Sequence, residues 1–501
     1  MPYDYLNAIA TLPGDAQDEF MGLADYVKLP RQMPEIKQEE VEPVVYAHTD
    51  MGNAERFVNQ HKQNIRYCPV TRAWYIWDGA RWEEDRKNIV YHLARLTVRS
   101  IPKEADNYPD DDARRQEVLK WAYKSESKER VRAIVELAKS DQSIVVKPDD
   151  FDKNHWLFNV SNGTLNLLTG QLQPHNREDL ISKISMVEYD PLAECPLWLQ
   201  FMDDIFRGNP YLIGYIQKIF GYCLTGSTKE QDFFILYGNG ANGKSTLIKI
   251  MMALLGSDYA KQTAANAFLV KQNETAGEEI AVLMGARMVV TSEVEDGKKL
   301  AEALIKQLTG DTTIRARRLY QDSVEFWITF KILMVVNNKP RISGTDYGMW
   351  RRSKLIPFTV TIPEEKQDFD LGDKLIKELP GILNWVLQGC LEWQKKGLKP
   401  PEEVDAATLG YRIESDAIGT FLDECVITDD PDAKIQAKTL YDAYKDWCST
   451  AGERSFSMRR FNDRLKERGF HITAGAHNLK FWHGVQVASI DLWNDISREV
   501  Y

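Results

Sequence analysis

The sequence is poor in cysteine and lacks the cysteine pairs that hold structural zinc. Its 501 residues include six scattered cysteines and no Cys-x-x-Cys pair. This pattern argues against a zinc module and a disulfide framework, and a reducing cytoplasm is the expected setting. No apolar run approaches the ~20 residues of a membrane span, and no basic-then-apolar signal opens the chain. We therefore expect no membrane partner.

A general excess of positive charge is also missing. The net charge of −11 argues against a protein that coats nucleic acid over its whole surface, but it leaves room for a local basic module. The charges are unevenly spread. Residues 1–47 hold nine acids and three bases (−6), whereas residues 434–485 hold ten bases and five acids (+5). Contacts with nucleic acid are therefore expected in the C-terminal part or at isolated basic clusters.

The chain is long enough for several domains. We see no internal repeat and no low-complexity tract, and Pro400-Pro401 marks one boundary. The composition and periodicity predict an acidic flexible arm, an α+β domain, an α/β nucleotide-binding domain with flanking helices, a linker and a basic C-terminal module. Their expected ranges are 1–47, 48–200, 201–400, 401–433 and 434–501.

The strongest motif follows an apolar, β-prone segment at 233–237 and precedes a helical pattern at 247–255. Its residues are Gly238, Asn239, Gly240, Ala241, Asn242, Gly243, Lys244, Ser245 and Thr246. Such glycines let backbone N–H groups face phosphate oxygens at a helix N-terminus. Lys244 would reach the β- and γ-phosphates and Ser245 would hold Mg²⁺, so we expect ATP and Mg²⁺. A plain glycine turn is disfavoured by the Gly-Lys-Ser spacing and by the flanks.

Two later apolar strands end in polar residues that could complete a hydrolytic site. The strand beginning at Arg287 ends at Glu293, a carboxylate that could hold Mg²⁺ through water and polarise the attacking water. Glu295 is the alternative, and a surface turn rich in acids is another. The strand from residue 330 ends at Asn337, which could sense the γ-phosphate. Asn337 and Asn338 could instead form a turn before the next proline.

Two arginine-rich segments also stand out. Arg351 and Arg352 precede an apolar strand; they are either a solvated surface pair or arginines that enter a neighbouring subunit's site. Upstream of Asn337 is a basic hairpin or loop, which suits phosphate pairing and base stacking on a DNA strand. Some of its arginines could instead pair with nearby acids. The candidate DNA-contacting residues here are Arg315, Arg317, Arg318 and Tyr320.

The C-terminal module reads as a helix over 438–448, a basic helix over 455–469 and a short β pair. This order is typical of a winged helix, and Phe461 and Leu465 are expected to face inward. Exposed bases on such a helix are candidates for phosphate contacts, although a protein-docking wing is the alternative. The candidates are Arg459, Arg460, Arg464 and Lys466.

Together these motifs resemble the superfamily III helicases, which are hexameric AAA+ DNA translocases. The helicase module of the phage/plasmid and poxvirus primase–helicase family is the most similar, and segments 50–57 and 160–170 resemble its N-terminal helicase-associated domain. The resemblance implies an α/β AAA+ P-loop core between an α+β helicase-associated domain and a C-terminal winged-helix domain. It also implies an ATP-dependent replicative DNA helicase of a phage or mobile element, with DNA threaded through a hexameric ring. Arg351 or Arg352 would then act in the neighbour's ATP site.

The chain departs from the family pattern in two ways. The strand before Glu293 ends in one acid rather than a tight pair, and the chain begins too close to the helicase-associated domain to contain the family's primase. We therefore expect no primase activity, a separate primase or other replication proteins as partners, and the cytoplasm of a bacterial host as the setting. Two rival functions are an ATP-switched origin-binding initiator or helicase loader without unwinding, and a non-DNA AAA+ machine.

Overall fold

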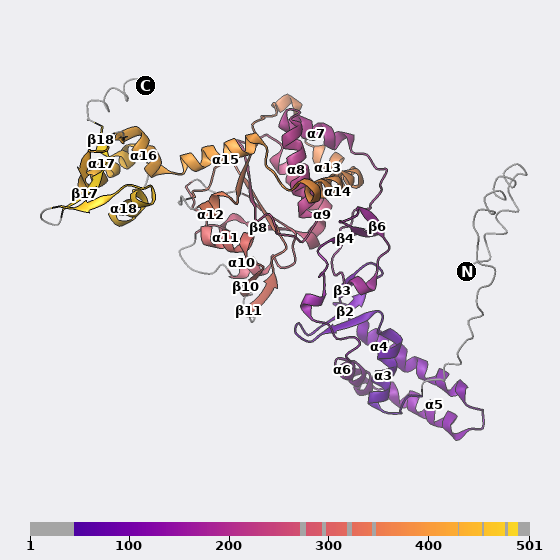
Figure 1. Cartoon of the computed structure of the whole chain (residues 1–501). Coiled ribbons are helices and arrows are strands. Elements are labelled where there is room, and N and C mark those ends of the chain that lie inside the picture. The colour runs from indigo at the N-terminus through magenta and orange to yellow at the C-terminus, as the bar shows by residue number, and fades with distance from the viewer. Residues whose placement is uncertain are drawn as a thin grey trace, which may run out of the picture.

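The computed structural model places most of the chain in helices and short sheets (Figure 1). The residues that it describes are 45–270, 277–292, 297–317, 323–342, 347–428, 430–452, 455–475 and 479–488. All but the last three residues of the expected acidic arm over 1–47 lie outside these ranges. Within them, no helix has the length and apolar character needed to cross a membrane.

The first part of the chain is a helical unit with a small antiparallel sheet. The strands are β1 (Ile65–Cys68), β2 (Ala73–Trp77) and β3 (Trp82–Glu84), in that order across the sheet. The helices are α3 (Asp50–His61), α4 (Ile89–Ser100), the 3₁₀ segment η1 (Ile101–Asn107), α5 (Ala113–Ser125) and α6 (Lys128–Ala138). Residues from α3, α4, α6 and β1 share one apolar core. Residues 86–145 are largely helical.

A second antiparallel sheet packs against the central domain. It contains β4 (Leu157–Val160), β5 (Gly163–Asn166) and β6 (Gln171–Gln173), and two helices follow, α7 (Pro196–Phe206) and α8 (Pro210–Cys223). The buried Phe158 and Leu165 share a core with α7, α8 and the central sheet. The expected boundary at residue 200 therefore does not separate two cores.

The central element is a five-stranded sheet in which every neighbouring pair of strands is parallel. Its order is β13 (Ser353–Pro357), β7 (Phe233–Tyr237), β12 (Lys331–Val336), β9 (Met288–Ser292) and β8 (Ala260–Ala264). Alternate β7 residues enter cores on opposite faces, Phe234 on one and Phe233 on the other. Burial on both faces explains the unbroken apolar runs of these strands. The expected α/β class is confirmed.

Helices cover both faces of this sheet (Figure 1). One face packs against α7, α8, α9 (Lys244–Tyr259), α13 (Leu371–Ile376) and α14 (Leu379–Lys396). The other packs against α10 (Gly277–Ala281), α11 (Glu302–Gly310), α12 (Tyr347–Trp350) and the hairpin of β10 (Thr313–Arg317) and β11 (Ser323–Trp327). Because the strands are parallel, their carboxyl ends meet at one edge, where ligands bind in open α/β sheets.

The stretch 401–433, expected to be a linker, is mostly helical. It contains α15 (Glu402–Glu414) and α16 (Ala417–Cys425). α15 is fixed to the central domain, because the Tyr411 hydroxyl donates to the carbonyl of Pro340 and Lys339 Nζ lies 2.6 Å from Glu414 Oε2. Val404 and Tyr411 are both buried and are seven residues apart, a spacing that places them on one face of the helix. The rest of the stretch is charged and follows two prolines.

The C-terminal module contains a helix, a basic helix and a β ribbon, as the sequence predicts. The helices are α17 (Ala437–Thr450) and α18 (Met458–Glu467). The strands are β14 (Val426–Ile427), β15 (Lys434–Gln436), β16 (Ile472–Ala474), β17 (Lys480–His483) and β18 (Gln486–Val487). Its core also includes Phe421 of α16, so the module begins earlier than residue 434. Figure 1 shows it beyond the end of α15. Its assignment as a winged helix stays an interpretation.

Candidate nucleotide-binding site

The glycine-rich loop lies between β7 and α9 at the carboxyl edge of the sheet, so the predicted strand, loop and helix are all present. The Gly238 N–H donates to the carbonyl of Val336 at 3.3 Å, which ties the start of the loop to β12. The Ile362 N–H donates to the carbonyl of Ala241 at 2.7 Å, which ties its middle to the chain beyond β13. The loop is thus held from both sides.

Two glycines of the loop are required by close packing. A Cβ atom on Gly238 would lie 2.4 Å from the carbonyl oxygen of Phe358. A Cβ atom on Gly243 would lie 2.4 Å from Ile205 Cγ2, and the Gly243 φ of +82° is in the left-handed region. A larger residue at either position would move the loop away from its neighbours.

Lys244, the first residue of α9, is buried, with 3% of its surface exposed. Its Nζ donates to the carbonyl of Gly238 at 2.6 Å and to Asn242 Oδ1 at 2.9 Å, and burial lowers its pKa. The Asn242 amide in turn reaches the carbonyl of Phe358 at 3.5 Å. Asn242 therefore links the lysine to the chain after β13, a role that the motif alone does not reveal.

The next two residues carry hydroxyl groups on the first turn of α9. Ser245 is exposed and Thr246 is half-buried. In the described part of the chain, no three His, Cys, Asp or Glu side chains gather as metal ligands. Magnesium at nucleotide sites takes most of its ligands from phosphate and water, so the accessible Ser245 hydroxyl fits the expected role without such a cluster.

A small cavity of about 160 Å³ opens beside the loop. Its lining comes from the end of β7, the start of the loop and residues 357–361, which begin at the last residue of β13. No sequence motif indicates that residues 357–361 belong to the site. β13 is the last strand of the sheet in chain order yet lies beside β7, the first, and no local pattern in the sequence shows that adjacency.

The structure brings Asn337 close to the loop. Val336 is paired with Tyr237, so Asn337 and Gly238 follow neighbouring strand ends, and Asn337 is exposed there. Ser292, the last residue of β9, is paired with Val335 of β12. Both Glu293 and Glu295 lie outside the described residues, so their roles stay predictions.

Arg351 and Arg352 lie at the opposite edge of the sheet. The Phe233 N–H donates to the carbonyl of Arg352 at 2.7 Å, which places the arginines at the amino end of β7. Both guanidinium groups donate to Gln231 Oε1, at 2.9 Å from Arg351 and 3.4 Å from Arg352. The five residues of β13, at about 3.3 Å each, put roughly 16 Å between them and the loop of the same chain.

The predicted basic hairpin is present as β10 and β11. Arg315 lies opposite Glu325, with 3.9 Å between Arg315 Nη2 and Glu325 Oε2. Both side chains are largely exposed, so this pair contributes little to stability and leaves the guanidinium accessible. Arg317 ends β10, and Arg318 and Tyr320 lie outside the described residues.

The basic helix α18 buries Phe461 and Leu465, as the sequence predicts. Three of the four candidate bases, Arg459, Arg460 and Lys466, are exposed, and Arg464 Nη1 donates to Glu467 Oε2 at 2.8 Å. The helix thus presents a basic outer face. This face lies in the C-terminal module, apart from the glycine-rich loop (Figure 1).

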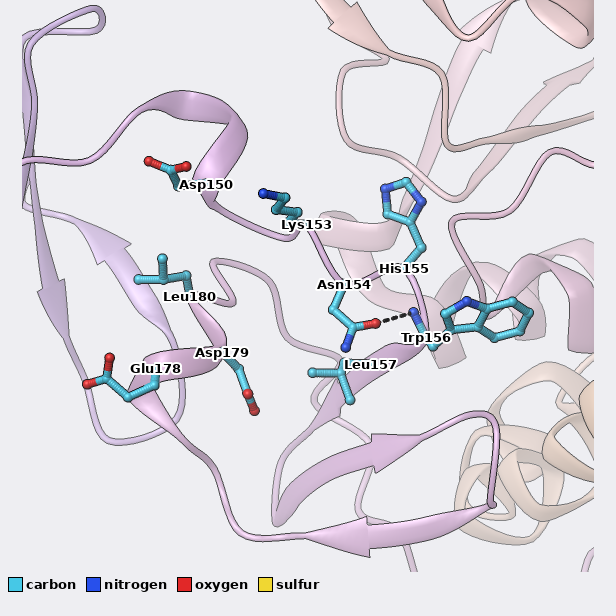
Figure 2. Close-up of a pocket in the computed structure, with 9 residues that line it drawn as sticks. All are labelled: Asp150, Lys153, Asn154, His155, Trp156, Leu157, Glu178, Asp179 and Leu180. Atoms are coloured by element: carbon cyan, nitrogen blue, oxygen red, sulfur yellow. Dashed lines mark hydrogen bonds between the residues drawn. The ribbon is translucent and has the colours of Figure 1, made fainter.

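A second hollow, of about 660 Å³, lies where the N-terminal part meets the central domain (Figure 2). Two segments line it, residues 150–157, which begin at the end of η2 (Pro148–Asp150), and residues 178–180, which overlap η3 (Arg177–Asp179). Its acids and bases do not converge on one point: Asp150 and Glu178 lie on one side and His155 on the other (Figure 2). This mixed lining favours no single class of ligand.

Three family models match parts of the chain. The model described as "D5 N terminal like" matches residues 54–207, and "Poxvirus D5 protein-like" matches residues 413–473. Between them, residues 236–352, which contain the glycine-rich loop, match a "Family of unknown function (DUF5906)". The first two matches support the resemblance to the viral primase–helicase family over the N-terminal and C-terminal parts. Membership of superfamily III stays a prediction.

Curated relatives give a consistent result. A protein named "Putative helicase" of Acanthamoeba polyphaga mimivirus is 26% identical over 321 residues, covering 60% of this chain and 33% of the relative. Another "Putative helicase", of Invertebrate iridescent virus 3, is 24% identical over 337 residues, covering 60% and 35%. A "Putative primase" of African swine fever virus is 25% identical over 332 residues, covering 60% and 34%.

The chain is related to viral helicase and primase proteins. It spans about a third of the length of these relatives, so their whole activities do not transfer to it. Among solved structures, the apo NrS-1 C-terminal region has a TM-score of 0.50 at 10% identity, covering 87% of this chain and 99% of that one. At this identity the similarity concerns the fold alone.

Proposed function

We propose that this chain is the ATP-hydrolysing motor of a replicative DNA helicase from a virus or another mobile element. One observation carries the proposal. The buried Lys244 ammonium is fixed by Gly238 and Asn242 at the carboxyl edge of a parallel sheet, at the N-terminus of α9. This is where polyphosphate binding is expected from the loop N–H groups and the helix dipole. The viral helicase relatives support the replicative role.

Each residue of the proposed site would have its own role in ATP hydrolysis. The loop and Lys244 would hold the phosphates of ATP, and Ser245 would hold the Mg²⁺, which neutralises charge on the phosphates. Glu293 would accept a proton from the attacking water, with Glu295 as its alternative. Asn337, exposed beside Gly238, would hydrogen-bond the γ-phosphate and so respond to its loss.

We further propose that ATP binds between subunits of a ring, with six subunits as the expected number. Arg351 and Arg352 lie at the far edge of the sheet from the loop of their own chain. They would therefore complete the site of a neighbouring subunit, where arginine neutralises charge that develops in the transition state. The hairpin that carries Arg315 would move along a DNA strand in the central channel.

The setting of this motor also belongs to the proposal. The relatives belong to viruses named for an amoeba, invertebrates and swine, which supports a viral origin. A bacterial host cytoplasm stays a prediction. No primase activity is proposed for this chain, and a separate primase would act beside it.

The test combines ATP turnover with strand displacement on forked DNA. We expect the full chain to separate the strands only with ATP and Mg²⁺, and Lys244→Ala to abolish both activities. Lys249→Ala, a change at an exposed lysine of the same helix, is the matched control and should retain both. Hydrolysis that persists in Lys244→Ala would refute the site. Turnover without strand displacement would favour an initiator or loader, and turnover indifferent to DNA would favour a non-DNA machine.

A further inference from the structure

A basic groove lies between α4 and α6, far along the chain from the glycine-rich loop. It encloses about 640 Å³. Four bases line it together with the exposed Tyr91 and a single acid, Glu126. The bases are Arg95, Arg99, Lys128 and Arg132. Four positive charges and one negative charge leave a local excess of +3 in a chain whose net charge is −11.

The helix period explains why these side chains share one surface. On α4, Tyr91, Arg95 and Arg99 are four residues apart and so lie along one face; on α6, Lys128 and Arg132 have the same spacing. The inner faces of both helices enter a shared apolar core. The core therefore fixes the helices, and the groove is part of a rigid surface.

These four bases are unpaired among the described residues and are clustered on one surface, and the clustering sets them apart from other exposed bases of the unit. No ion pair joins any of them to another described residue, and like charges four residues apart on a helix repel each other. Some other bases of the same unit are paired. Arg130 Nη1 lies 2.8 Å from Asp50 Oδ1, Lys139 Nζ lies 2.7 Å from Glu136 Oε1, and Arg56 Nε lies 2.6 Å from Glu104 Oε1.

Two further features of the groove suit an extended polyanion. α6 begins at Lys128, so its N-terminal turn, which favours negative charge, lies at the groove. Tyr91 adds an exposed aromatic ring beside the arginines, and a base or sugar can stack on such a ring. A small anion would need one or two of the four bases, whereas a strand with phosphates at regular spacing can engage all of them.

We propose that this groove binds the sugar–phosphate backbone of a DNA strand, as a contact separate from the hairpin of β10 and β11 and from α18. The proposal rests on the proposed function for the identity of the polyanion. It adds a site on the N-terminal unit that would hold DNA when no nucleotide is bound.

The experiment measures binding of a fluorescent single-stranded oligonucleotide to the full chain without ATP, over a series of salt concentrations. The groove variant is Arg95→Gln, Arg99→Gln and Arg132→Gln combined. The control, Lys62→Gln, Lys103→Gln and Lys120→Gln, removes the same charge from exposed lysines of the same unit outside the groove. Thermal unfolding and ATP turnover without DNA show whether both variants remain folded.

We expect the groove variant to bind about ten-fold more weakly at moderate salt. The slope of log K against log salt should fall by about 2, because each lost phosphate contact of a single strand contributes about 0.7. The control should match the parent chain. Equal losses in both variants, or no loss in the groove variant, would overturn the proposal.

This result can be separated from failure of the motor. Lys244→Ala should retain groove-dependent DNA binding, because the measurement contains no nucleotide. A chain that binds DNA through the groove but does not hydrolyse ATP would contradict the proposed function alone. A groove variant that still hydrolyses ATP, displaces strands and binds DNA with unchanged affinity would contradict the groove proposal alone.

Discussion

Lys244 and Asn242, two residues apart in the loop after β7, are joined by a hydrogen bond of 2.9 Å from the lysine Nζ to the amide Oδ1. The Asn242 amide nitrogen also faces the carbonyl of Phe358. One side chain thus positions the lysine and connects the loop to the neighbouring strand, so nucleotide binding and the position of β13 should depend on each other.

We expect Asn242→Ala to weaken ATP binding and to lower kcat/KM about ten-fold, because a hydrogen bond to a charged group contributes about 1.5–3 kcal/mol. Asn239→Ala, a change at an exposed residue of the same loop, is the control and should have a small effect. The loss should appear mainly in KM, since Asn242 acts through Lys244. Equal effects of the two changes would show that Asn242 does not position the lysine.

Mixing two inactive variants should restore ATP turnover if Arg351 and Arg352 act in the ATP site of a neighbouring subunit. We expect Arg351→Ala with Arg352→Ala to lower turnover by about 10³-fold while nucleotide still binds. A mixture of this double variant with Lys244→Ala chains should regain turnover. In the mixture, the intact loop of the double variant would form an ATP site with the intact arginines of a Lys244→Ala subunit. Mixtures of Lys244→Ala and Ser245→Ala cannot complement and serve as the control. No recovery in the first mixture would place the arginines outside the ATP site.

Lys331 should make stability depend on pH. Burial, with a smaller contribution from nearby Arg287, lowers its pKa to about 7, although Cys223 and Cys390 oppose the shift. Its Nζ donates to carbonyl groups, including that of Thr329 at 3.3 Å. In the unfolded chain the pKa returns to about 10.4, so between pH 7 and that value only the unfolded chain keeps the proton.

The free energy of unfolding should therefore rise with pH over this window, by at most about 1.4 kcal/mol for each pH unit from this group. Below pH 7 the cost of burying the charge is fully present. Lys331→Met should remove this component, whereas Lys366→Met, at an exposed lysine, should keep it. Chemical denaturation at several pH values measures the difference, and parallel curves for the parent chain and Lys331→Met would contradict the assignment.

Local patterns were sufficient to predict the elements that carry the loop. The apolar run before Gly238, the glycines and the helical pattern after Lys244 correspond to β7, the loop and α9. In the same way, the inward positions expected on the basic helix correspond to the buried Phe461 and Leu465 of α18. These features are determined by residues that lie close together in the sequence, so local patterns are sufficient to predict them.

Features that depend on distant parts of the chain could not be predicted. The cavity wall after β13 adjoins the loop because strands more than a hundred residues apart are paired, and local periodicity has no information on that pairing. The helical structure of 401–433, expected to be a linker, depends on distant contacts in the same way. α15 is stabilised by contacts with residues near 340 and 355, whereas its own sequence is charged and begins after two prolines.

α15 joins the sheet edge beside the nucleotide loop to the C-terminal module. Lys339, two residues after Asn337, pairs with Glu414 near the end of the helix, and the Leu355 N–H donates to Thr408 Oγ1 at 3.0 Å. The contacts of α15 with the central domain lie in its C-terminal half, at Thr408, Tyr411 and Glu414, and α16 begins three residues after Glu414. The start of the C-terminal module is therefore held beside the chain that follows Asn337, on the same edge of the sheet as the nucleotide loop.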